Sequence, residues 1–200
     1  MNTAIPRSVK ALSAAIILGS HYWLSATPVW SATQERPDAG MRTALLEAIN
    51  SSDSFTDRFD AEVWLTDMSQ RLQSRVKDPE ERLTILKQVH YEASKSGLAP
   101  ELILALINVE SNFDHFAISS VGARGLMQIM PFWLEEIGRP DDNLFDISTN
   151  LRFGCTILNI YLKREKGDMR RALARYNGSV GKNWYPQRVY KALRTTWYRQ

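Results

Sequence analysis

One carboxylate stands out along the chain as a candidate for acid–base chemistry. Glu110 closes a stretch, residues 102–109, in which every residue except Asn108 is apolar. A carboxylate at the end of such a helix is costly unless it is solvated or paired. An apolar setting raises the pKa of a carboxyl group and keeps it protonated near neutral pH, which is what a general acid needs. The helix pattern alone leaves a plainer interpretation open: a solvated glutamate at a helix end, or one paired with Arg124.

Other kinds of chemistry find little support in the composition. The 200 residues include one cysteine and three histidines, which excludes a disulfide scaffold and a zinc site built on several thiolates. His90 and His115 lack metal-ligand spacing, so we expect neither a metal nor a cofactor, and we expect Cys155 to pack as a small hydrophobe. The formal net charge of +3 is raised by two basic residues near the N-terminus, and a near-neutral body predicts no binding of duplex nucleic acid.

The N-terminus has the layout of a secretory signal. Arg7 and Lys10 precede an apolar run at residues 11–24, and small residues follow up to a predicted cleavage site after Ser31. The run is short for a membrane span, which takes about 20 apolar residues. We therefore expect residues 1–31 to be a signal peptide that exports the protein to the periplasm. An uncleaved anchor is the weaker alternative.

The residues after the signal predict an all-α protein. Residues 32–54 are polar and mixed and are expected to form a linker. Apolar residues then recur at steps of three and four, as in amphipathic helices, and no window alternates as a strand would. Asp78-Pro79 is a helix start signal, and Gly97 a stop. Predicted helices cover residues 57–76, 79–96, 100–110, a short segment near Leu126 interrupted by Pro131, 150–163, 169–176 and the tail from Trp184.

Four ordered motifs surround and follow Glu110: Glu110-Ser111-Asn112-Phe113, the glycine-bearing stretch 122–131, residues 150–154, and residues 172–178. Together they resemble the soluble-type lytic transglycosylases (SLT), the lysozyme-like enzymes that cleave bacterial peptidoglycan. The resemblance covers roughly residues 98–189. It implies a lysozyme-like transglycosylase domain at residues 97–200, preceded by an N-terminal helical extension at residues 55–96 that packs on its core.

The resemblance also implies roles for individual residues. Glu110 would be the sole catalytic acid/base, and Tyr176 would reach toward its carboxyl group and position it. The implied substrate-binding residues are Ser111, Ser119, Met127, Gln128, Met130 and Asn177. Four of these residues have plainer alternatives: Met127 and Met130 could be core residues, the Tyr176 hydroxyl could be bound by backbone, and Ser119 could cap a turn.

The family's reaction needs one carboxylate where most glycosidases use two. Asp114 is expected to be a local cap or a partner of Arg124 rather than a second acid. The resemblance implies cleavage between N-acetylmuramic acid and N-acetylglucosamine, leaving a 1,6-anhydromuramyl end. Two alternatives stay open: a muramidase of the same fold that uses water, and a non-catalytic module that binds peptidoglycan or assists envelope assembly.

Glycan strands of peptidoglycan are the expected partner, and proteins of the envelope or of a secretion apparatus are compatible ones. We expect a monomer. The aromatic tail could cover the loop after Tyr176 or pack on the helix at residues 57–76, and the sequence does not choose between them. Its members are Trp184, Tyr185, Tyr190, Trp197 and Tyr198.

Overall fold

The computed structural model describes Gly40, residues 54–55 and residues 57–198. The predicted signal peptide and nearly all of the predicted linker lie outside these residues. From residue 54 onward the described chain belongs to a single compact unit. Among the described residues, no helix has both the length and the apolar character that a membrane crossing requires.

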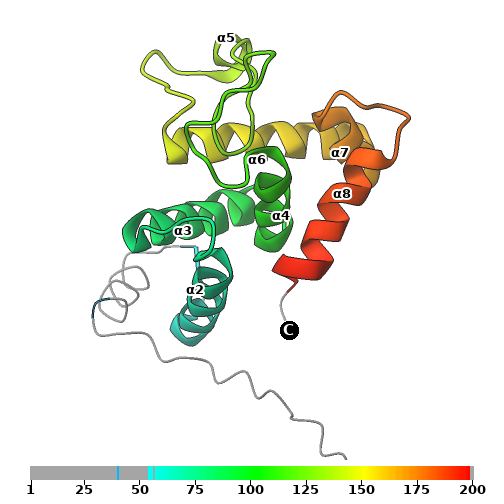
Figure 1. Cartoon of the computed structure of the whole chain (residues 1–200). Helices are drawn as coiled ribbons and strands as arrows, with labels where there is room; N and C mark the ends of the chain where they lie inside the picture. Colours follow the sequence, from blue (N-terminus) through cyan, green and yellow to red (C-terminus); the bar gives the residue numbers. More distant parts are fainter. Residues whose placement is uncertain (1–39, 41–53, 56, 199–200) are drawn as a thin grey trace, which may run out of the picture. The chain divides into compact units, whose positions relative to one another are not determined.

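Helices make up the regular structure of the described part of the chain, which confirms the all-α prediction (Figure 1). In place of strands, the described residues have only two isolated backbone bridges, both at Arg124. The elements are α2 (Arg58–Leu72), α3 (Pro79–Lys95), α4 (Pro100–Glu110), α5 (Trp133–Ile137), α6 (Ile147–Arg164), α7 (Met169–Tyr176), α8 (Trp184–Ala192) and a π-helical turn, η1 (Leu193–Trp197).

Local signals in the sequence fix several helix ends. An aspartate caps the N-terminus of four helices, and its side chain accepts backbone N–H groups of the first turn. These caps are Asp57 for α2, Asp78 for α3, Asp146 for α6 and Asp168 for α7. The Asp78 carboxylate accepts from the N–H of Glu80 at 3.0 Å. The predicted start of α3 is therefore confirmed, and α7 has the predicted bounds.

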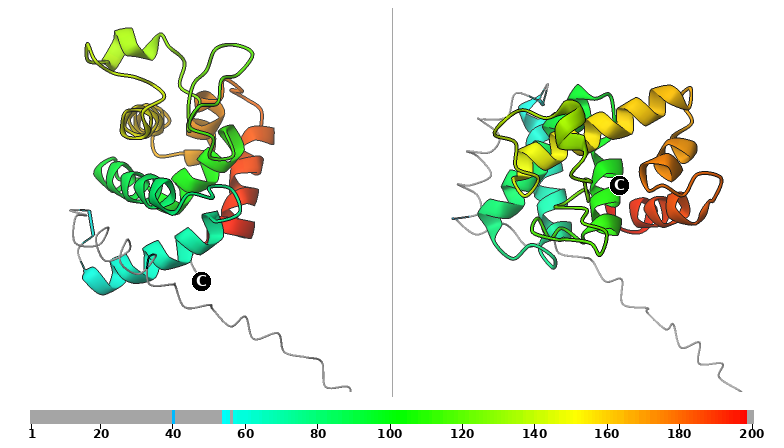
Figure 2. Two further views of the ribbon diagram at one scale, coloured as in Figure 1. Left: turned by 60° about the vertical axis from the view of Figure 1, so that its left-hand side comes forward. Right: turned by 90° about the horizontal axis from the view of Figure 1, so that it is seen from above.

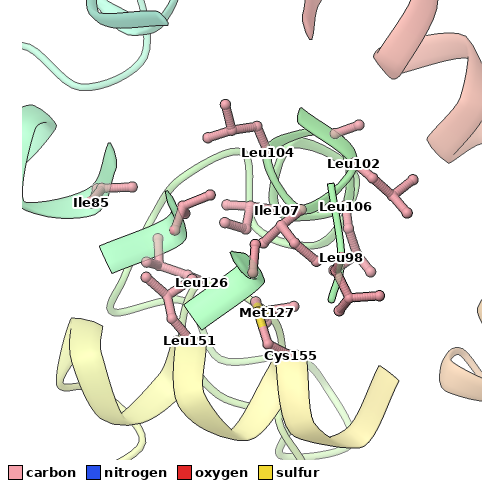
Figure 3. Packing of buried hydrophobic residues seen from close by; sticks show 14 of the residues in the cluster. Ile85, Leu98, Leu102, Leu104, Leu106, Ile107, Leu126, Met127, Leu151 and Cys155 are labelled. Carbon is pink, nitrogen blue, oxygen red and sulfur yellow. The ribbon is translucent and has the colours of Figure 1, made fainter. Parts of the chain in front are cut away.

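Helix α4 lies in the middle of the hydrophobic core. Its residues 102–107 are all buried, and it packs against α3, α8 and η1. The views in Figure 2 show α3 and α8 on either side of it. Figure 3 shows the close packing of Leu104, Leu106 and Ile107 near Leu126, Met127, Leu151 and Cys155. Cys155 is buried in this core, as predicted for a small hydrophobe, and burial raises the pKa of its thiol.

The structure corrects two details of the predicted helices. The segment around Leu126 is a tight turn, and the short helix α5 begins only after Pro131. In α2, Phe59 is 72% exposed and Val63 is 41% exposed, although both fit the apolar periodicity. The buried face of α2 is built instead on Ala61, Trp64, Leu65, Met68 and Leu72.

Candidate active site

Glu110 is the last residue of α4, where the buried helix reaches the surface. Its Oε1 accepts a hydrogen bond from the hydroxyl of Tyr185. Burial raises the pKa of the Glu110 carboxyl above its ordinary value, and this effect exceeds the lowering by the Tyr185 hydrogen bond and by the charge of Arg188. The side chain is thus a partly buried acid with one defined donor and one nearby cation.

Tyr185 reaches Glu110 because α8 packs along α4. Tyr185 is 1% exposed, and burial together with the Glu110 charge raises the pKa of its hydroxyl far above the ordinary value. The hydroxyl therefore keeps its proton and acts as a donor. Sequence reasoning missed this residue, because nothing in the aromatic tail distinguished Tyr185 from its neighbours.

The hydroxyl of Tyr176 contacts a different group. It donates to the backbone carbonyl of Met127 at 2.8 Å, so the contact with Glu110 that the resemblance implied for Tyr176 is made by Tyr185. Burial raises the pKa of the Tyr176 hydroxyl, and the nearby charge of Glu110 raises it further. In this structure, Tyr176 supports the turn that contains Met127.

The chain reverses sharply after Glu110. Asn112 and Phe113 have φ values of 51° and 71°, in the left-handed region that non-glycine residues rarely adopt. Two contacts of the Ser111 hydroxyl stabilise this reversal: it donates to the carbonyl of Leu126 at 2.8 Å and accepts from the N–H of Phe113 at 3.2 Å. Ser111 thereby ties the end of α4 to the neighbouring turn.

The predicted motif at residues 150–154 holds that same turn. The side chain of Asn150 is 1% exposed. Its Oδ1 accepts from the N–H of Met127 at 2.8 Å, and its Nδ2 donates to the carbonyls of Arg124 at 2.9 Å and Leu144 at 2.7 Å. One amide therefore fixes three backbone groups, none of which could be left unpaired in the core without a cost.

Close contacts around Asn150 and Met127 explain two glycines, Gly125 and Gly154. A Cβ at Gly154 would lie 2.1 Å from the sulfur of Met127, so the helix must lack a side chain there. Gly125 has φ +74°, and a Cβ there would lie 2.3 Å from Nδ2 of Asn150. The motif residues at 125, 150 and 154 thus have structural reasons for their types.

Gln128 also stabilises the turn. It adopts a left-handed φ of 51°, and its Nε2 donates to the carbonyls of Ala117 at 3.2 Å and Gly125 at 3.0 Å. The backbones of Arg124 and Ile129 close the turn with two hydrogen bonds to each other, each of 2.9 Å. Gln128 as a residue is partly exposed, although its side-chain nitrogen is held by these two carbonyls.

The other predicted substrate-binding residues lie in different settings. The Ser119 hydroxyl accepts from the N–H of Ala123 at 3.0 Å, as in a capped turn. Met127 is fully buried, and we therefore assign its side chain a packing role rather than a place in a groove. Met130 is partly exposed, and Asn177 is the exposed residue that ends α7.

Asp114 is a local cap. Because α4 stops at Glu110, Asp114 does not continue the helix by one turn, and its Oδ1 accepts from the N–H of Phe116 at 2.9 Å. The guanidinium of Arg124 lies 5.8 Å from the ring centre of Phe145. Within the described part of the chain, no three His, Cys, Asp or Glu side chains come together as a metal site would need.

Comparison with known proteins identifies the family of the domain that contains this site. The family model described as "Transglycosylase SLT domain" matches residues 87–196, from within α3 to the π-helical turn. The match covers more than half of the chain. The chain belongs to the SLT transglycosylase domain family.

Two relatives illustrate the range of the match. The "Transglycosylase" of Enterobacteria phage PRD1 is 33% identical over 108 residues, which are 50% of this chain and 40% of the phage protein. The "Membrane-bound lytic murein transglycosylase C" of Yersinia enterocolitica is 32% identical over 112 residues, which are 48% of this chain and 31% of that protein. The match therefore spans less than half the length of either relative.

Among solved structures, an inactive mutant of the lytic transglycosylase Slt from Pseudomonas aeruginosa aligns with a TM-score of 0.44 and 23% sequence identity. The alignment covers 77% of this chain and 29% of the Slt chain.

Proposed function

We propose that this protein is a peptidoglycan lytic transglycosylase in which Glu110 serves first as general acid and then as general base. The observation that carries the proposal is the partly buried Glu110 carboxyl, to which Tyr185 donates a hydrogen bond and whose pKa is raised by its burial. The family membership and the names of the murein-cleaving relatives support the substrate class.

The two opposing influences on Glu110 suit a group that must change roles. Burial favours the protonated form, which can donate a proton to the glycosidic oxygen between N-acetylmuramic acid and N-acetylglucosamine. The resulting carboxylate is stabilised by the Tyr185 hydroxyl and by the charge of Arg188. That carboxylate then accepts the proton of the muramyl 6-hydroxyl as the hydroxyl attacks the anomeric carbon. The product is a 1,6-anhydromuramyl end, and no water is consumed.

The positive charge that develops at the anomeric carbon needs support during this reaction. We assign that role to the substrate's own N-acetyl group or to the pocket around it. Ser119, Gln128, Met130 and Asn177 are proposed to contact the glycan. Ser111 and Tyr176 are proposed to act indirectly, by holding the turn at residues 122–131 against the end of α4.

The proposal extends to location and organisation. We propose export by residues 1–31, a linker at residues 32–54, and action in the periplasm by a monomer. The regions 55–96 and 97–200 are proposed to be the helical extension and the transglycosylase domain. Envelope or secretion proteins remain compatible partners.

The test is the identity of the sugar products released from purified peptidoglycan, determined by mass spectrometry. Wild-type protein is expected to release anhydromuramyl products. Glu110→Gln keeps a similar shape but has no proton to exchange, so the rate should fall by about 100-fold to 10,000-fold. Circular dichroism of both proteins controls for folding.

Two results would replace this proposal. Products with reducing ends that disappear in Glu110→Gln would identify a hydrolase of the same fold. A folded wild-type protein that binds peptidoglycan but releases no product over a range of pH would identify a binding module.

A further inference from the structure

The near-neutral total charge hides two oppositely charged parts of the chain. Residues 54–162 contain ten Lys and Arg against sixteen Asp and Glu, a formal charge of −6. Residues 163–198 contain ten Lys and Arg against two Asp and Glu, a formal charge of +8. Since the distribution of charge sets the local field, a near-zero sum does not exclude a strong local interaction with a polyanion.

Most cations of the second part are free to act on a partner. Glu165 is occupied by Arg171 at 2.7 Å and by Arg175, and Asp168 caps α7. The other basic side chains are exposed and form no ion pair with any described residue. We call these eight residues the basic end: Lys163, Arg164, Lys166, Arg170, Lys182, Arg188, Lys191 and Arg194.

The basic end borders the candidate active site. It occupies the end of α6, then α7, α8 and η1, and these elements pack on one another in chain order. Figures 1 and 2 show α7 and α8 side by side, with α8 running along α4. Helix α8 contributes both Tyr185, which touches Glu110, and Arg188, whose charge acts on Glu110. Arg188 is therefore within reach of a polymer bound at Glu110, and the other cations lie on α8, on the elements that pack next to it in chain order, or on the connections between these elements.

We propose that the basic end binds the free carboxylates of peptide stems on the glycan strand and thereby selects stem-bearing peptidoglycan over bare glycan. The inference rests on the proposed function for its substrate. Peptidoglycan is a neutral sugar chain to which acidic peptides are attached, so positive side chains recognise the stems and not the sugars. Long-range attraction of this kind raises the encounter rate and weakens with salt.

An anionic membrane surface is the competing occupant, since Trp184 is exposed in the same region. The position of the cations argues for the stems: two of them, Arg188 and Lys191, lie on α8, the helix whose Tyr185 hydroxyl contacts Glu110. A lipid surface would have no reason to lie beside the reacting carboxyl.

The experiment compares binding of three forms of the protein in the Glu110→Gln background, so that no polymer is cut. The test variant is Lys182→Gln/Lys191→Gln/Arg194→Gln, three exposed cations outside the catalytic machinery. A matched control removes three exposed cations from the acidic part: Arg58→Gln/Lys77→Gln/Lys95→Gln. Cosedimentation is measured with intact peptidoglycan, with chitin as a neutral N-acetylglucosamine polymer that lacks stems, and with phosphatidylglycerol vesicles, at low and high salt.

We expect the test variant to bind intact peptidoglycan several-fold more weakly than either the parent or the control, with the difference lost at high salt. Binding to chitin should be equal for all three. Equal binding of the test variant and the parent to intact peptidoglycan would overturn the proposal. So would an equal loss on both polymers, or a charge-dependent affinity for vesicles that exceeds the affinity for peptidoglycan.

The proposed function is judged separately from the products of the protein with Glu110 intact. If that protein releases no product while the stem-dependent binding is seen, the transglycosylase proposal fails and the binding surface stands. If products appear but binding does not depend on the stems, the transglycosylase proposal stands and the proposal for the basic end fails.

Discussion

The hydroxyl of Tyr185 donates to Oε1 of Glu110, 75 residues earlier in the chain. A second tyrosine hydroxyl, that of Tyr176, donates to the carbonyl of Met127 at 2.8 Å. The two bonds have different consequences, because the first acts on the ionisation of the carboxyl group and the second on the position of a turn. Substitution of each tyrosine by phenylalanine separates the two effects.

Tyr185→Phe should change the pH dependence of the reaction. The Tyr185 hydrogen bond lowers the pKa of Glu110, so its loss raises that pKa further. The limb of the pH profile on which activity falls with rising pH should move to higher pH, and the maximal rate should fall by about tenfold or more. The measurement is the rate of product release as a function of pH.

Tyr176→Phe is the matched control for that experiment. It should reduce the free energy of unfolding by about 1 kcal/mol through the lost bond to Met127 and leave the limb in place. A shift of the limb in Tyr176→Phe but not in Tyr185→Phe would contradict the assignment of roles.

Glu110→Gln should stabilise the fold at neutral pH. Because the pKa of Glu110 is raised in the folded state above the reference value of 4.5, ionisation favours the unfolded state. The wild-type protein therefore loses stability as the pH rises through the unfolded and then the folded pKa, and the neutral amide does not. The melting temperature of Glu110→Gln should exceed that of wild type at pH 7, and the difference should shrink below about pH 4. A variant that melts lower than wild type at pH 7 would refute this.

Gly154→Ala should destabilise the protein through one identifiable clash. The added Cβ would lie 2.1 Å from the sulfur of Met127 and 2.9 Å from its Cβ. Overpacking of this kind costs about 1–3 kcal/mol, measurable by urea denaturation. Met127→Ala alone should cost about 2–5 kcal/mol by leaving a cavity. The double variant Gly154→Ala/Met127→Ala should lose less free energy of unfolding than the two single variants lose together. If the two losses simply add, the clash at Gly154 involves another group.

His90 should make stability depend on pH. Its ring stacks on Phe55 at 3.5 Å between centroids, and burial lowers the pKa of His90 to about 4, against the opposing charge of Glu101. The unfolded chain takes up this proton near the ordinary value of 6.5, so the folded state loses stability as the pH falls from about 6.5 toward 4.

The expected loss is on the order of 1–2 kcal/mol, since solvent screens a ring that is only partly buried. His90→Gln should remove this part of the dependence. The measurement is the free energy of unfolding of both proteins at several pH values between 7 and 4. Parallel curves for the two would contradict the assignment.

The parts of the fold that were predictable depend on local signals. Asp78 followed by Pro79 specifies the start of α3 through backbone geometry and capping alone. The apolar run before Glu110 predicts a buried helix because its residues are apolar on every side. Such features need no knowledge of distant residues.

The details that were missed depend on partners far along the chain. The turn at Leu126 is fixed by Asn150, whose amide reaches Met127 from 23 residues away, so the local sequence wrongly suggested a helix. Tyr185 became part of the site only when α8 docked on α4. Its residue type alone did not separate it from the other tail aromatics.

The helix that carries Glu110 is secured by the part of the described chain that is synthesised last. The indole N–H of Trp197 donates to Oδ1 of Asn108 at 3.1 Å, across 89 residues. Arg71 donates to the carbonyl of Thr196 at 2.8 Å, across 125 residues. Chains emerge from the ribosome with the N-terminal part first, so a nascent chain that ends before α8 contains Glu110 without its donor or this support. We therefore expect a chain truncated before residue 197 to lack the proposed acid–base activity of Glu110.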